Sequence, residues 1–555
     1  MRASPANLSH DTHFPAPHLK FDILIELLHH VPQQSDASAL TRTCKTLYEQ
    51  GTKVLLRRGV TVENGAQILS FCDFLLRNPN SRLPYLRKLH LKLRLMEGVE
   101  EDESVDDEED LPAHVCNVLA KTLRMMSSLE DLTIESCEEL FERKPAIQQA
   151  IMALKGLRRL QIASVGVLAG ELLEGMQSSL VELDVHCYSE ELYEPTPVMS
   201  LLTRNQLNVE KLSAWYVEVG TSALQFPRVR ALALRSLYAF DIENLHKTFP
   251  GLQYLELTAP EPAVVEDAIA DHGRLGHSSR WKSLRYLCGS VDALYALGPV
   301  SRVAKVEVDC ICSTGECLSR LRAVVSDAQP TCLVLHTGFY GHGVLDLSEL
   351  AELLPPEGVP SMTHLMLDLA VDKLTGTKGD LMAGLTSLLK RSPIEFCILR
   401  IAEICDCEGE ATKPPLEAVA AADGGDGRHG QSEEDDANAD NDTDADGESE
   451  DGDQGREHGG QESAHFSIRN SDGYHIAQTL PLAQHQQLVR ELAGAGNSLT
   501  HVVVKIHRQG DTHWAIERSD KGLKLKKLEA TIGAALVRAH DLGPNDRSSG
   551  LEGIP

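Results

Sequence analysis

Apolar residues recur along this chain in a short phrase: an apolar residue, two others, an apolar residue, one other, and a third apolar residue. Leu86, Leu89 and Leu91 form the first copy. Clear copies begin at 86, 129, 157, 180, 209, 229, 252 and 303, and weaker ones at 284, 330, 362, 394 and 499. Because side chains alternate between the faces of a strand, each copy predicts one short strand that buries its second and third apolar residues.

The six best-spaced copies, from 129 to 252, begin 20 to 29 residues apart. This period is typical of leucine-rich repeats, which stack so that neighbours share one core. Segments of helical period lie between the phrases, for example Leu381 to Leu389, and would return the chain so that successive strands pair in parallel. We therefore predict an α/β fold, with an irregular leucine-rich-repeat solenoid over residues 83–407.

Residues that flank the second and third apolar positions should point to the concave face of the solenoid. Aromatic and arginine side chains dominate binding hot spots. The residues of these types that we expect to bind a partner are Trp215, Arg235, Tyr254, Tyr286 and Phe396. Tyr254 and Tyr286 hold the same position in successive phrases and could stack. The alternative is that such aromatics shield strand edges or pack under a loop. Other residues expected on this face are Lys88, His90, Lys92, Arg159 and Arg400.

A distinct unit at residues 17–60 precedes the repeats. Its apolar residues have helical spacing in three short runs, and Pro32 ends the first run. A further helix is predicted from Gly65 to Asn78, within a linking region at 61–82, because its apolar residues recur at helical spacing and Pro79 follows.

This unit resembles an F-box domain. Leu19, the run Asp22–Leu24 and the pair Cys44–Lys45 match the family pattern, whereas the family's proline is Lys20 here. The resemblance implies that the unit packs against a Skp-type adaptor of a cullin ubiquitin ligase. The residues it assigns to the adaptor contact are Leu19, Phe21, Ile23, Leu24, Leu27, Cys44 and Leu47.

An F-box-like unit followed by degenerate repeats also resembles F-box-like proteins of mushroom-forming fungi. The resemblance implies a substrate receptor that holds the adaptor with its helices and an unidentified client protein with its repeat face. Two alternatives remain open: the helices only seal the first repeat, or the protein is an interaction scaffold without a ligase, which Lys20 slightly favours.

The formal net charge of −29 is concentrated in two segments. Residues 97–110 contain ten acidic residues and no basic ones, so their net charge is −10. Residues 421–460 contain fifteen acidic residues and two arginines, so their net charge is −13. Such segments lack the apolar surface to fold. We predict disorder at 1–16 and 408–463, an acidic insert at 97–110, a terminal repeat and cap at 464–540, and a loose tail at 541–555. The mild charge elsewhere gives no support to nucleic-acid binding.

No nucleophile elbow, Walker loop or zinc-protease motif occurs in the sequence, so we expect no enzyme activity and no cofactor. Residues 442–453 imitate a calcium loop without flanking helices, and Cys310, Cys312 and Cys317 lack zinc-site spacing, so no metal is expected. The thirteen cysteines form no disulfide framework, and neither an apolar leader nor a membrane span is present. We therefore expect a cytoplasmic or nuclear location.

Overall fold

The computed structural model describes residues 20–93, 112–187, 208–258, 281–402 and 484–540, apart from short gaps inside the last three ranges, and a few isolated residues between them. The segments predicted as disordered or acidic, at 1–16, 97–110, 408–463 and 541–555, lie outside the described residues. So do Leu19, Cys310 and Cys312.

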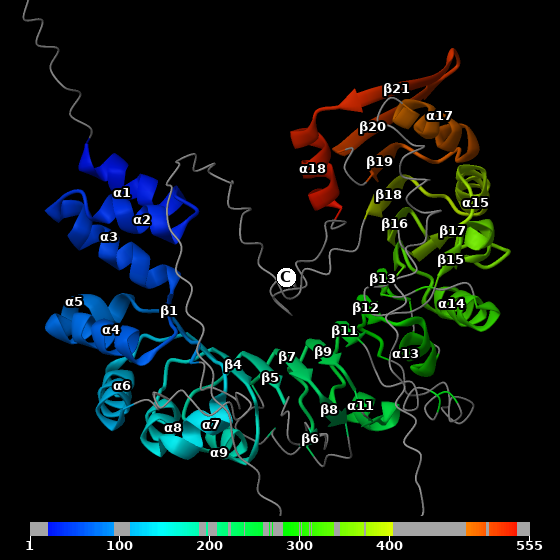
Figure 1. The fold of residues 1–555 in the computed structure, drawn as a ribbon. Coiled ribbons are helices and arrows are strands. Elements are labelled where there is room, and N and C mark those ends of the chain that lie inside the picture. The colour runs from blue at the N-terminus through cyan, green and yellow to red at the C-terminus, as the bar shows by residue number, and fades with distance from the viewer. Residues whose placement is uncertain are drawn as a thin grey trace, which may run out of the picture.

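One sheet of sixteen strands runs through the molecule and curves into an open arc (Figure 1). Its strands stand side by side in chain order, and all neighbours from the first strand to β19 are parallel. The strands are β1 (Val60–Val62), β2 (Lys88–Leu91), β3 (Asp131–Ile134), β4 (Arg159–Ala163), β5 (Glu182–His186), β7 (Lys211–Trp215), β9 (Ala231–Arg235), β11 (Tyr254–Thr258), β12 (Tyr286–Gly289), β13 (Lys305–Val308), β14 (Cys332–His336), β16 (His364–Ala370), β18 (Phe396–Ala402), β19 (His501–Ile506), β20 (Gly510–Ser519) and β21 (Gly522–Leu528).

The predicted strand positions are confirmed. Each of the thirteen phrases is followed, two residues after its first apolar residue, by the start of a strand, as at Leu86 and β2 or Ile394 and β18. The strands pair with equivalent positions opposite each other, so that Leu89 faces Leu132 and Leu132 faces Leu160. This register lines up the second apolar residues of all phrases in one buried column.

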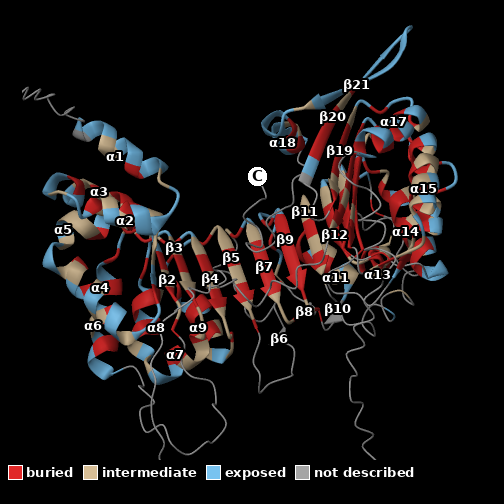
Figure 2. Cartoon of the chain, turned by 45° about the horizontal axis from the view of Figure 1, so that its top comes forward, coloured by how far each residue is buried: buried red, intermediate tan, exposed pale blue. Residues whose placement is uncertain are grey.

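Helices cover the outer side of the arc, opposite the open side of the sheet (Figure 1). They are α4 (Gly65–Arg77), α5 (Pro79–Arg82), α6 (Ala113–Met125), α7 (Cys137–Arg143), α8 (Pro145–Met152), α9 (Val167–Gly175), α11 (Ile242–Thr248), α13 (Val291–Ala296), α14 (Gly315–Ala328), α15 (Lys378–Arg391) and α17 (His485–Ala495). Their apolar sides and the buried columns of the strands form one continuous core that follows the arc (Figure 2). α4 and α15 confirm the helices predicted at those positions.

Three helices stand at the N-terminal end: α1 (Phe21–His30), α2 (Gln34–Thr41) and α3 (Lys45–Arg58). They enclose a small core of their own, formed by Leu28, Ala37, Leu47 and Val54, which is separate from the core of the sheet. α3 joins this helical unit to the sheet, because its Leu56 belongs to the core of the sheet.

The sheet extends beyond the predicted strands at both ends. β1 precedes the first phrase, and the strand predicted to be the last is followed by two more, β20 and β21. β20 pairs antiparallel with β19, and β21 pairs antiparallel with β20. The turn between β20 and β21 contains Gly522, whose φ of +115° suits glycine. A final helix, α18 (Ala530–Ala539), then returns to the inside of the arc (Figure 1). The region predicted as a terminal repeat and cap thus holds two strands and a helix beyond the last phrase.

Short strands and turns complete the described chain. β6 (Thr196–Pro197), β8 (Val217–Val219) and β10 (Ala239–Phe240) form a second sheet, and β15 (Leu345–Asp346) pairs with β17 (Leu374–Thr375). Two 3-10 turns lie at η1 (Leu83–Tyr85) and η4 (Leu347–Glu352).

Candidate functional site

The side of the large sheet that faces away from the outer helices, here called the inner face, lines the concave side of the arc (Figure 1). On β2, Leu89 and Leu91 are buried in the core, whereas Lys88 and His90 between them are partly or fully exposed. The same alternation places Arg159, Trp215, Tyr254, Tyr286 and Arg400 on the inner face. The predicted facing of these residues is therefore confirmed.

Charges of alternating sign line the N-terminal part of the inner face. Lys88, Asp131, Arg159, Glu182 and Lys211 follow one another in register on β2 to β7. Lys88 Nζ lies 3.6 Å from Asp131 Oδ2, Arg159 Nη1 lies 3.7 Å from the same atom, and Lys211 Nζ lies 3.6 Å from Glu182 Oε1. Arg159 also pairs with Glu182. Since each charge sits beside an opposite one, this ladder is nearly neutral and offers little net attraction to a charged partner.

Burial of the charges in this ladder is unfavourable, as the carboxyl group of Asp131 shows. Burial raises the pKa of its carboxyl above the ordinary value, although Arg159 and Lys88 act in the opposite direction. Desolvation of the carboxylate therefore outweighs the attraction of its two basic neighbours. The ion pairs around Asp131 therefore contribute little to the stability of the fold.

Trp215 lies in a stack near the middle of the inner face. The ring of His186 lies against it, with centroids 5.0 Å apart, and the Arg235 guanidinium lies 4.6 Å from its ring centroid. Arg235 donates from Nε and Nη2 to Glu256 Oε1, over 2.9 and 2.7 Å. Arg235 is buried by these contacts, whereas Trp215 is only partly buried. Trp215 is thus held on both sides before any partner binds.

Tyr254 and Tyr286 lie side by side, as predicted. They are register partners on β11 and β12, with ring centroids 6.2 Å apart and planes tilted by 41°. The Tyr286 hydroxyl donates to Glu307 Oε2 over 2.9 Å. Burial, followed by the neighbouring Cys288 and Glu307, raises the pKa of this hydroxyl well above its ordinary value. Tyr286 therefore remains a protonated hydrogen-bond donor at neutral pH.

A chain of polar contacts continues from Glu307 across the next three strands. His336 Nε2 lies 3.3 Å from Glu307 Oε1, and His336 Nδ1 lies 3.2 Å from Asp368 Oδ2. Arg400 Nη1 lies 3.1 Å from the same Asp368 oxygen. Both ring nitrogens of His336 face carboxylate oxygens, so both contacts are hydrogen bonds only when both nitrogens carry a proton. The five residues from Tyr286 to Arg400 link five neighbouring strands.

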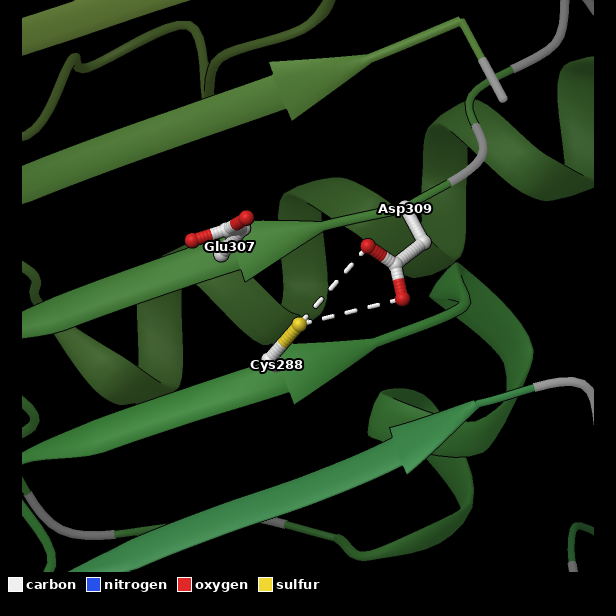
Figure 3. Close-up of side chains that lie close together, drawn as sticks. All are labelled: Cys288, Glu307 and Asp309. Carbon is white, nitrogen blue, oxygen red and sulfur yellow. Dashed lines mark hydrogen bonds between the residues drawn. The ribbon is translucent and has the colours of Figure 1, made fainter. Parts of the chain in front are cut away.

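Three side chains in this region lie close enough together to share a metal ion. The Cys288 thiol lies 3.7 Å from both carboxylate oxygens of Asp309, and Glu307 completes the group (Figure 3). All three are buried, and within the described part of the chain no other set of histidine, cysteine and acidic groups is so close. Glu307, however, already accepts from Tyr286, with His336 and Lys305 nearby. Protein contacts therefore account for this carboxylate without an ion.

The C-terminal part of the inner face is covered. Phe396 is only 2% exposed and lies in an apolar cluster with Ile398 and with Val537 of α18. The expectation that Phe396 contacts a partner on an open surface is therefore wrong for this conformation. A helix that crosses the inner face from the far end of the chain leaves no trace in the local pattern around Phe396.

The residues proposed for adaptor contact fall into different environments. Ile23 and Leu27, one turn apart on α1, are 51% and 46% exposed. Leu24 and Cys44 pack partly against the core of the three helices, and Leu47 is a central residue of that core at 1% exposure. Leu47 is thus a structural residue and not a surface contact. Leu19 and the Phe21 side chain lie outside what the structure describes.

Several inner-face residues were not singled out from the sequence, namely Glu256, Glu307, His336 and Asp368. They occupy the same flanking positions as Tyr254, Arg235 and Arg400, so the alternation of the phrase already placed them on this face. The three acidic residues among them were missed because only aromatic and basic residue types were taken as candidates. The signal that could have found them is charge complementarity between equivalent positions of neighbouring phrases.

No protein-family model matches the chain, and no curated protein was found to be similar to it. Among the residues that the structure describes, no helix has the length and apolar character that crossing a membrane requires.

Proposed function

We propose that this protein is a non-catalytic recognition subunit, an F-box-like helical unit followed by a leucine-rich-repeat solenoid, that serves as a substrate receptor of a cullin-type ubiquitin ligase. The observation that carries the proposal is the apolar pair on α1, Ile23 and Leu27, which stays uncovered although α1 has a packed core beneath it. The residues of this unit also match the F-box pattern at the positions given above.

The exposed pair is suited to a protein partner. Burying a side chain of this size contributes about 1.5–3 kcal/mol, and Tyr48 of α3, at 43% exposure, adds a third large apolar side chain on the same helical unit. Among the described residues only a few large apolar side chains are this exposed, and three of them belong to these three helices. A Skp-type adaptor that covers Ile23 and Leu27 would remove this surface from water.

The inner face is the proposed client surface. Trp215, Tyr254 and Tyr286 present partly exposed aromatic rings there, and neighbouring side chains fix their positions. Rigid aromatic side chains bind with little loss of conformational entropy. The catalytic steps would be carried out by the partner enzymes of the ligase.

The adaptor contact is tested with the full-length chain and a purified Skp-type adaptor. We expect Ile23→Asp and Leu27→Asp each to weaken binding by at least about thirtyfold, the equivalent of roughly 2 kcal/mol, in isothermal titration calorimetry. Val167→Asp is the matched control, because Val167 is 77% exposed at the start of α9, outside the three helices. If the unmodified chain does not bind at micromolar concentration, the ligase proposal fails.

Lys20 favours the second candidate, an interaction scaffold without a ligase. It stands where the F-box family has proline, and it is the N-cap of α1 with φ −66° and ψ 135°. Proline adopts this φ without strain, so Lys20→Pro should preserve α1. Tighter adaptor binding by this variant would support the F-box assignment. If neither the variant nor the unmodified chain binds the adaptor, the interaction scaffold is the favoured function.

A further inference from the structure

One row of the inner face becomes apolar at its C-terminal end. Val334, Met366, Ile398 and Val503 follow Glu307 of β13 in register there, beside the polar row of His336, Asp368 and Arg400. They form a cluster of their own, separate from the main core, and the side chains that cover it are Val537 and Leu536 of α18. A ten-residue helix is thus all that the described chain places over this surface.

α18 packs very closely where it crosses β20. A Cβ at Gly533 would lie 2.1 Å from Cγ of His513, so the helix backbone rests directly on this imidazole ring. His513 is 5% exposed, and its Nδ1 atom has no hydrogen-bond partner in the described part of the chain. A proton added to that nitrogen would therefore place an unpaired charge beneath the helix.

Three more histidines surround the C-terminal end of α18. His540, the C-cap residue, lies 2.9 Å from His364 Nε2 through its Nδ1 atom. The ring centroids of His540, His501 and His364 lie 4.9, 5.7 and 5.9 Å from that of Phe396. The contact between His364 and His540 needs one donor and one acceptor, so it exists only while at least one of the two nitrogens is unprotonated.

The charged groups around this cluster do not compensate several added protons. Glu395 lies near His364, and Asp511 lies near His513 but pairs with Lys505 over 2.8 Å. Thr363 and Thr500 contribute only hydroxyl groups, to His364 and His501. Arg538, in the last turn of α18, is a further cation.

We propose that α18 is a pH-sensitive cover of the inner face: it packs on the apolar surface of β14 to β19 while His364, His501 and His513 are neutral, and it dissociates from this surface when they become protonated. Release would expose Phe396 and its apolar neighbours to solvent. The inference does not depend on association with a ligase, because the cover and its histidines all belong to this chain.

The direction of the pH dependence follows from the environments of the histidines. Burial is the largest cause that lowers the pKa of His364, His501 and His513, and His540 adds to the effect on the first two. The covered state thus binds protons less readily than the released state. Docking is therefore strongest above the ordinary histidine pKa of about 6.5 and weakens as the pH falls below it, by at most about tenfold for each histidine between pH 7.5 and 5.5.

Hydrogen exchange of the full-length chain, measured by mass spectrometry at pH 7.5 and 5.5 and corrected for intrinsic exchange rates, tests this inference. We expect amide protection in α18 to fall at least tenfold at the lower pH, while protection in α17 on the outer side is maintained. His540→Phe keeps a ring against Phe396 but removes the imidazole that contributes to the lowered pKa of His364 and His501. We expect it to respond to pH severalfold less than the unmodified chain.

Gly533→Ala gives the released state without a change of pH. The added methyl group collides with His513, whereas alanine favours the helix itself by about 1 kcal/mol relative to glycine. Lost protection at pH 7.5 would therefore reflect displacement and not a weaker helix. Equal protection of α18 at both pH values, a parallel loss in α17, an unchanged pH response of His540→Phe, or full protection in Gly533→Ala would each overturn the proposal.

Discussion

Side chains at equivalent positions of neighbouring strands can make different hydrogen bonds. Tyr254 and Tyr286 are register partners on adjacent strands and both lie on the inner face. The hydroxyl of Tyr286 donates to Glu307, whereas that of Tyr254 has no hydrogen-bond partner among the described residues. The pair therefore separates the contribution of a ring from that of a hydroxyl group.

Tyr286→Phe should lower the free energy of unfolding by about 1.5–3 kcal/mol, because it leaves a buried carboxylate without one of its donors. Tyr254→Phe should change it by no more than about 0.5 kcal/mol. Urea unfolding followed by circular dichroism measures both. Equal effects of the two substitutions would show that the Tyr286 hydroxyl does not stabilise the network from Glu307 to Arg400.

Among the secondary-structure elements, one helix can cap the N-terminus of its neighbour. α9 begins at Val167 without a cap from its own N-cap residue, Gly166. The carboxylate of Glu138, on α7, accepts from the backbone nitrogens of Gly166, Leu168 and Ala169 over 3.0, 2.8 and 3.1 Å. One acidic side chain thus satisfies three amide groups at the start of a helix in the next unit, where negative charge is also favoured.

Glu138→Ala should therefore cost about 1–3 kcal/mol of unfolding free energy, since buried amide groups lose their acceptor. Glu142→Ala, at an exposed position of the same helix, is the matched control and should have little effect. Thermal and urea unfolding of both variants provide the comparison. If Glu138→Ala also proves neutral, water replaces the carboxylate and α9 does not depend on α7.

At the scale of the whole molecule, charge and folded structure are separated along the chain. Residues 421–460 carry a net charge of −13 and contain no valine, leucine, isoleucine, methionine or aromatic residue. The described strands and helices form a core that is continuous without this segment.

Deleting residues 421–460 should leave the melting temperature within a few degrees, because the deleted residues have little apolar surface to bury. The formal net charge would change from −29 to −16, the difference being −13, and the isoelectric point should rise above about 5.2. Calorimetry and isoelectric focusing test the two expectations. Loss of a cooperative transition would mean that this segment packs against the large sheet or its helices.

The apolar phrases were sufficient to predict thirteen strands of the large sheet, their order and their facing. Side chains alternate with a period of two along a strand, so the phrase around Leu252 was sufficient to place Tyr254 on the inner face and Leu255 in the core. Parallel pairing in chain order then brought equivalent positions together. The position of α4 also followed from local spacing, because helical period and a terminal proline are local features.

The phrases did not predict which of the correctly faced residues are exposed, because exposure depends on how distant segments pack. Phe396 and Arg235 point to the inner face, yet α18 covers the first and the stack on Trp215 buries the second. Leu47 likewise proved to be core. Exposure depends on contacts between segments far apart in the chain, such as His364 and His540, and such contacts leave no periodic signal because they are made once.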